Sequence, residues 1–273
     1  MKKILLFALL IITTSSNAQE INLAEVAKEI TAEGKELYRL ERTSWLGTDI
    51  ALKTIPTEKI GGYFSYASDG QFTCVFFNRE VRPEILATMQ FDSTFSSETS
   101  KIDSKKREFT TYERDIYALR SKALLIMNTD TIFKTYDRMN LNIIPIINGN
   151  EHKAYVLTGP EENGVVIFGN DYLMNFDSAN NLISLKVLHR NIIPMTFEDS
   201  DKEIMHTYHS HRGETSDFMT ATDVCTLMLY AKYAKWKNHI VYSDKYVTLW
   251  NCERHTMMIL TKEAYDRMYE KRK

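Results

Sequence analysis

The chain has 273 residues, with 34 basic and 36 acidic side chains, and 44% of its residues are hydrophobic. That length is enough for one large domain or two smaller ones with real cores, and the slightly negative net charge disfavours a nucleic-acid partner. The three cysteines, Cys74, Cys225 and Cys252, allow at most one disulfide bridge and exclude a disulfide framework.

The first 19 residues have the organisation of a cleavable signal peptide. Lys2 and Lys3 precede an apolar stretch over residues 4–12, and a small polar region ends at Ala18 and Gln19. The apolar stretch is shorter than the roughly 20 residues that a membrane helix needs, and no cysteine stands at the cleavage position to accept a lipid. We therefore predict a periplasmic or secreted mature chain without a membrane anchor.

Residues 20–150 are expected to form an N-terminal α+β region whose role the sequence does not indicate. Apolar residues recur at helical spacing over residues 23–40, which predicts an amphipathic helix. The aromatic runs 62–66 and 72–77 flank a Ser-Asp-Gly turn signal, which predicts a β-hairpin.

A polar segment separates this hairpin from a second helix. Residues 92–107 are rich in Ser, Thr, Asp and Lys, which predicts a loop or linker. Thr110 and Glu113 have the spacing of a capping box, so a helix is expected to begin there and to continue past Leu124.

Residues 151–273 interleave short β-branched and aromatic runs with two helical patterns. The runs predict strands at 153–158, 164–169, 173–176, 182–188, 207–211, 240–242, 246–250 and 257–260. The helical patterns cover about 222–236 and the charged segment from about 262. The whole chain is therefore expected to have an α+β fold of mixed layers.

Candidate metal ligands lie in the second region. His209 and His211 are two positions apart on a predicted strand, so their imidazoles point to the same side of the sheet. Asp223 falls in the first turn of the following helix, where its carboxylate can turn back toward the strand. Two histidines, one aspartate and a water would form an open four-coordinate site, the arrangement of hydrolytic zinc. The alternative is a pair of surface histidines beside a carboxylate that complements the helix dipole.

The spacing of these residues resembles a known family. The order His-x-His, then Thr220-Ala221-Thr222-Asp223, is similar to the motif of the JAB/JAMM (MPN+) metallopeptidases, and Glu161-x-x-Gly164 before an apolar strand is similar to their upstream glutamate motif. The resemblance implies zinc ligands at His209, His211 and Asp223, a general base at Glu161 and an oxyanion-stabilising hydroxyl at Thr220.

Some positions depart from the family pattern. Arg212 stands where the family has proline, the spacing to Asp223 is one residue longer, and a predicted strand rather than a helix precedes Glu161. Glu161 and Glu162 can therefore also be read as ordinary residues of a polar turn, and either could be the base. His189 and His206 are expected to be core or solvated histidines rather than ligands.

Two functions from different classes follow from these patterns. The first is an exported zinc-dependent hydrolase that cleaves a peptide, isopeptide or related amide bond, with a JAB-like domain over residues 151–273. The second is a non-catalytic exported binding or scaffold protein with a degenerate JAB-like fold. The orientation of Glu161 or Glu162 toward the three ligands distinguishes them.

Overall fold

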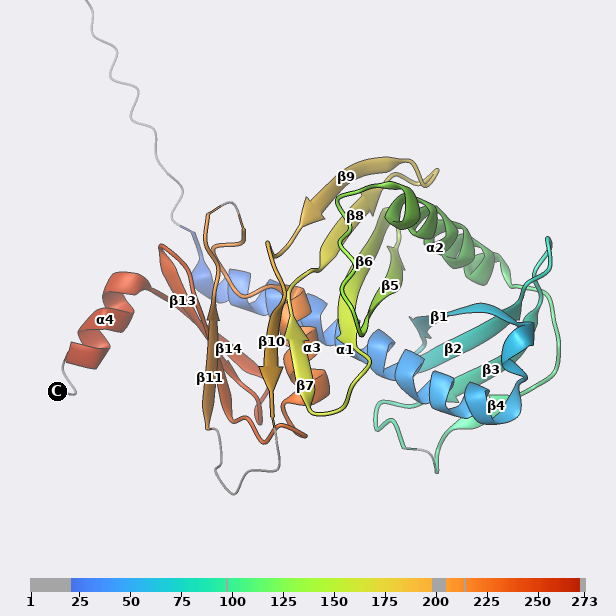
Figure 1. Ribbon diagram of the computed structural model, residues 1–273, viewed down its shortest axis with the longest axis horizontal. Coiled ribbons are helices and arrows are strands. Elements are labelled where there is room, and N and C mark those ends of the chain that lie inside the picture. The colour runs from blue at the N-terminus through green and yellow to red at the C-terminus, as the bar shows by residue number, and fades with distance from the viewer. Residues whose placement is uncertain (1–20, 97, 198–204, 214, 271–273) are drawn as a thin grey trace, which may run out of the picture.

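The computed structural model describes residues 21–270 except residues 97, 198–204 and 214, so the predicted signal peptide lies outside the described residues. The fold is mixed α+β, as predicted, with helices packed among four β-sheets over the described part of the chain (Figure 1). In that part, no helix combines the length and the apolar character needed to cross a membrane.

The long helix α1 (Leu23–Thr54) runs from the C-terminal sheet to the N-terminal sheet (Figure 1). It begins where the Asn22 side chain accepts a hydrogen bond from the Glu25 N–H. The predicted helix over 23–40 is confirmed, but the observed one continues to Thr54, because its second half packs on the N-terminal sheet.

The N-terminal sheet is antiparallel in the order β1-β2-β3-β4, and the predicted hairpin forms its first two strands. Its strands are β1 (Ile60–Ser68), β2 (Gln71–Asn78), β3 (Ile85–Phe91) and β4 (Lys101–Asp103). The short strand β4 lies at the sheet edge, inside the segment predicted as a loop. Helix α2 (Thr111–Thr129) begins at Thr110 with the predicted capping box.

A second antiparallel sheet has the order β5-β6-β8-β9 and packs against α2. Its strands are β5 (Met139–Asn148), β6 (Glu151–Pro160), β8 (Tyr172–Phe176) and β9 (Leu182–Val187). The division expected between residues 150 and 151 coincides with the turn of the β5–β6 hairpin, so this sheet draws strands from both predicted regions. Pro145 is accommodated in β5 because that strand lies at the sheet edge.

The C-terminal part contains the remaining strands and the helix that carries Asp223. Strand β7 (Val165–Phe168) pairs with β10 (Ile193–Thr196), and the C-terminal sheet has the order β11-β12-β13-β14. Its strands are β11 (His206–Ser210), β12 (Asn238–Tyr242), β13 (Tyr246–Asn251) and β14 (Thr256–Thr261). Strand β11 is parallel to β12, and the other pairs are antiparallel. Helix α4 (Lys262–Glu270) follows β14.

Helix α3 (Ala221–Tyr230) lies against α1 and ends earlier than the predicted residue 236. After Tyr230 the chain forms turns, and Lys235 adopts a left-handed conformation with φ of 57° that ends any helical continuation. Cys225 is buried on α3, as predicted, and burial raises the pKa of its thiol. All three cysteines are free and buried, so the disulfide that the sequence allowed is not formed.

Candidate metal centre

Strand β11 brings the two predicted histidine ligands to the same side of the C-terminal sheet. His209 lies in the strand, and His211 follows its last residue. The His211 N–H still donates to the Tyr242 carbonyl at 2.8 Å, so the pairing with β12 continues past the strand end. The alternation of side chains is therefore maintained, and both imidazoles are buried beneath the sheet surface.

The first turn of α3 holds the third predicted ligand. Thr220 is the N-cap, and its hydroxyl accepts from the Asp223 N–H at 3.1 Å in a capping box. In return, Asp223 Oδ2 accepts from the Thr220 N–H at 2.8 Å and from the Thr220 hydroxyl at 2.9 Å. The capping box thereby fixes one carboxylate oxygen and leaves Oδ1 facing the histidines.

A fourth residue, His189, completes the cluster. One ligand atom from each of His189, His209, His211 and Asp223 lies within 4.8 Å of the other three, and all four residues are buried. The His189 Nε2 atom is 2.8 Å from His211 Nε2 and 3.2 Å from Asp223 Oδ1. His209 Nε2 is 3.1 Å from His211 Nε2 and 3.5 Å from Asp223 Oδ1.

These separations run from 2.8 to 3.5 Å and are close to the edges of a coordination tetrahedron. Zinc bonds to imidazole nitrogen and carboxylate oxygen are about 2.0–2.2 Å long, which places adjacent ligand atoms about 3.3–3.5 Å apart. The His189 Nε2 atom, at 2.8 Å from His211 Nε2 and 3.2 Å from Asp223 Oδ1, lies somewhat closer to its neighbours than that. If His189 instead were a general base that contacted a metal-bound water, its Nε2 atom would lie farther from the other three ligand atoms. The geometry therefore allows His189 to be a fourth protein ligand of a metal ion.

The other nitrogen of each imidazole is hydrogen-bonded. His189 Nδ1 donates to Asp171 Oδ1 at 2.6 Å, and His211 Nδ1 donates to the Ser216 carbonyl at 3.1 Å. His209 Nδ1 lies 2.8 Å from His239 Nε2. Such partners select the tautomer and orient the ring, and they leave the Nε2 lone pairs available at the centre of the cluster.

Local structure explains why His189 reaches the cluster. The Leu188 N–H donates to the Asp171 carbonyl at 2.9 Å, which extends the pairing of β8 with β9 beyond Val187. His189 therefore lies beside Asp171, whose second oxygen accepts a hydrogen bond from the Thr222 hydroxyl on α3. Asp171 thus links the end of the second sheet to the helix that carries Asp223.

Aromatic and imidazole rings cover the cluster on the β7 side. The Phe168 ring lies 5.1 Å from the His209 ring and stacks on the His239 ring at 4.8 Å. His239 is fully buried, and burial lowers its pKa to about 3. This neutral, apolar cover strengthens electrostatic interactions at the centre of the cluster.

The protonation of the cluster reflects its burial and its carboxylates. Burial lowers the pKa of His209 to about 4, because it outweighs the attraction of Asp223. Burial opposes protonation of His189 as well, but there Asp171 and Asp223 prevail and raise its pKa well above the ordinary value. Burial favours the neutral acid of Asp223, yet the neighbouring histidines hold its pKa well below the ordinary range. A positive charge is therefore favoured at the centre.

The donor atoms of the cluster could hold a metal ion. Asp223 Oδ1 is buried and accepts no well-formed hydrogen bond among the described residues, and its nearest polar neighbour is His189 Nε2 at 3.2 Å. The buried carboxylates of Asp171 and Asp223 both contact His189, so a cation at the centre of the cluster would have acidic groups of the chain beside it.

The structure does not bring Glu161 to the predicted ligands. Glu161 is exposed on the turn before β7 and lines a cavity of about 450 Å³ with Trp45, Tyr230 and Tyr233. Tyr230 lies about two turns beyond Asp223 on α3, a separation of about 10 Å along the helix axis. Strand β7 also separates the two sites, because its far end carries the Phe168 ring that contacts His209.

The other candidate residues have roles that the hydrogen bonds define. Glu162 is exposed and forms an ion pair with Arg138, so neither glutamate faces the cluster. Thr220 contacts Asp223 as its helix cap and positions that carboxylate. His206 is exposed, as expected, whereas His189 is a member of the cluster rather than a spare histidine. No local spacing identifies His189, because its position depends on the pairing of β8 with β9.

No family model matches this chain, no curated protein matches it, and no solved structure matches it. The similarity to the JAB/JAMM motif therefore depends on the sequence pattern of His209, His211, Thr220 and Asp223 alone. What the structure adds is a buried group of three histidines and one aspartate that could hold a metal ion.

Proposed function

We propose that this chain is an exported zinc-binding protein. Its centre, closed by His189, His209, His211 and Asp223, would stabilise the C-terminal part of the fold. One observation carries the proposal: the buried Asp223 Oδ1, which accepts no hydrogen bond among the described residues, faces the Nε2 atoms of His189 at 3.2 Å and His209 at 3.5 Å. A bound ion would join β11, the end of β9 and α3. When bound, it would contribute its binding free energy to folding.

The donor set favours zinc of the structural type. Imidazole nitrogen with one carboxylate oxygen in a tetrahedral arrangement is typical of zinc, and a site closed by four protein ligands is typical of structural rather than catalytic centres. Asp171 and His239, which accept hydrogen bonds from the Nδ1 atoms of His189 and His209, are the outer partners that such a centre needs.

Elemental analysis of the purified mature chain tests the proposal. We expect close to one zinc per chain, most of it lost in Asp223→Asn and in His189→Ala. The matched control is His206→Ala, which changes an exposed histidine on β11, the strand that carries His209. This variant should keep the zinc content of the wild type. A wild-type protein without zinc that takes up none on reconstitution would favour the metal-free scaffold reading, with His189 protonated between two carboxylates.

A second candidate is the zinc-dependent hydrolase of peptide, isopeptide or related amide bonds. The order and spacing of His209, His211, Thr220 and Asp223 favour it, because the JAB/JAMM resemblance implies that set for hydrolysis. In this reading three residues hold the ion, and His189 lies outside the coordination shell. The ion would then act as a Lewis acid on the scissile carbonyl.

Substitution of cobalt(II) for zinc separates the two candidates. A closed site predicts a tetrahedral cobalt spectrum that azide does not change, with no turnover of peptide or cross-linked peptide substrates. A hydrolytic site predicts a spectrum that shifts with azide and measurable turnover. If turnover is found, Glu161→Gln tests whether that carboxylate is the base, since a general base typically contributes about 10²–10⁴-fold in rate.

A further inference from the structure

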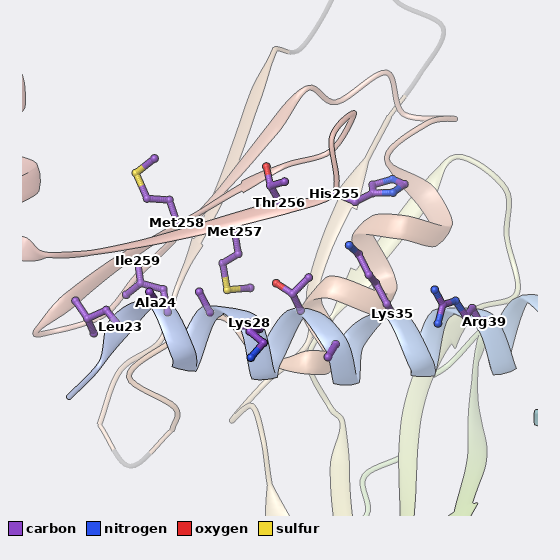
Figure 2. Close-up of a pocket in the computed structure, with 13 residues that line it drawn as sticks. Leu23, Ala24, Lys28, Lys35, Arg39, His255, Thr256, Met257, Met258 and Ile259 are labelled. Atoms are coloured by element: carbon purple, nitrogen blue, oxygen red, sulfur yellow. The ribbon is translucent and has the colours of Figure 1, made fainter.

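A long groove separates the first half of α1 from strand β14, away from the metal centre. Its volume is about 890 Å³, within the range of about 300–1,000 Å³ that ligand pockets commonly have. Helix and strand run in opposite directions along it, so Leu23 faces Ile259 at one end and Lys35 lies near His255 at the other (Figure 2). Strand β14 is the edge of its sheet.

One end of the groove is apolar. Leu23 and Ala24 on the helix lie opposite Ile259 on the strand, and the Met257 side chain reaches from the strand toward the helix (Figure 2). Met258, between them, points away from the helix (Figure 2), so Met257 and Ile259 form the strand's side of this apolar end. An apolar surface of this kind on a concave wall is suited to a hydrocarbon chain.

The other end of the groove is cationic. Lys35 and Arg39 line it beside His255, and no carboxylate is among the residues that line the groove. Within the described part of the chain, neither Lys35 nor Arg39 has a carboxylate within 4.0 Å, whereas Lys28 pairs with Glu25 at 3.0 Å. Burial and the nearby Lys35 lower the pKa of His255, so this imidazole is a neutral hydrogen-bonding group at neutral pH.

This separation of apolar and charged ends indicates the class of ligand. Leu23 and Arg39 are about 24 Å apart along the helix, a distance that a long unbranched chain with one charged end can follow. An acidic peptide would present charges along its whole length, but the cations without a carboxylate partner are confined to one end of the groove, where Arg39 also lies 6.0 Å from the centre of the Phe72 ring. We propose that the groove binds a single-chain anionic amphiphile, with its head at Lys35 and Arg39 and its chain over Ala24, Met257 and Ile259.

Equilibrium titration of the purified mature chain with hexadecanoate, below its micellar concentration, tests this site. We expect saturable binding of one molecule per chain. Hexadecanol, which has the same chain and a neutral head, should bind at least tenfold more weakly. Inorganic phosphate and an acidic peptide should not bind at comparable concentrations. Comparable binding of phosphate or of the acidic peptide would overturn the proposal, as would equal affinities for hexadecanoate and hexadecanol.

Variants test the two ends of the groove separately. K35Q/R39Q should weaken hexadecanoate binding at least tenfold without changing hexadecanol binding. Ala24→Phe should weaken the binding of both, because it fills the apolar end. Lys53→Gln, an exposed lysine in the last turn of α1, is the matched control and should bind as the wild type does. Unchanged affinity in both groove variants, with wild-type circular dichroism and zinc content, would refute the site. If K35Q/R39Q fails to fold, Lys35→Gln and Ala24→Phe provide the same test.

Discussion

Replacement of Gly34 by alanine tests the contact that holds α1 against the helix of the metal centre. A Cβ atom added at Gly34 would lie 2.5 Å from Val224 Cβ and 2.9 Å from the Ala221 carbonyl oxygen. Both neighbours belong to the first turn of α3, one residue or two from Asp223. At an unhindered helical position the same change stabilises a protein by about 0.5–1 kcal/mol. Overpacking costs about 1–3 kcal/mol, and the backbone oxygen here leaves little room for relief.

We therefore expect Gly34→Ala to lower the free energy of unfolding by about 1–2 kcal/mol, which corresponds to a Tm about 2–8 °C lower for a chain of this size. Thermal unfolding followed by circular dichroism measures this shift. Gly159→Ala is the control, because an added Cβ there meets nothing within 4 Å. A higher Tm for Gly34→Ala than for the wild type would refute the close approach of the two helices.

Three further predictions concern buried polar groups and thiols. Glu113→Gln should lower the free energy of unfolding by about 2–4 kcal/mol at pH 7, because a buried carboxylate loses its paired bonds from Arg107. Burial alone would raise the pKa of Glu113, but the hydrogen bonds from Arg107, Thr110 and Tyr66 outweigh it, so the pKa is lower than usual. The difference in unfolding free energy between the wild type and Glu113→Gln should therefore vanish as the pH falls through that lowered pKa, which acid denaturation measures. Asp171→Asn should weaken zinc binding about 10–100-fold in chelator competition, because Asp171 orients His189; an unchanged affinity would exclude that role. The three buried cysteines should react with maleimide only after denaturant is added, and rapid labelling of the native protein would contradict their burial.

Features that depend on local chemistry could be predicted from the sequence. The capping box of Thr110 and Glu113 is a local arrangement, and it forms as predicted. The period of two along a strand places His209 and His211 on the same side, and the cap at Thr220 turns Asp223 back toward them. The predicted approach of these three ligands, to within about 5 Å of a common point, is confirmed.

Features that depend on tertiary contacts could not be predicted in this way. His189 joins the cluster only because the β8–β9 pairing extends past Val187 and places it beside Asp171. Similarly, the spacing of Glu161 to Gly164 matches the family motif, yet strand β7 begins after that turn and carries the glutamate away from the cluster. A short motif specifies residue types and intervals, but not the direction in which a strand leaves the site.

We propose that His189, His209, His211 and Asp223 together form a closed metal centre. Anomalous diffraction at the zinc edge, from crystals of the mature chain grown with zinc, locates the ion itself. We expect one peak within about 2.2 Å of the three Nε2 atoms and of Asp223 Oδ1. The proposal is contradicted if no peak is found there, or if His189 is turned away and solvent occupies the fourth position.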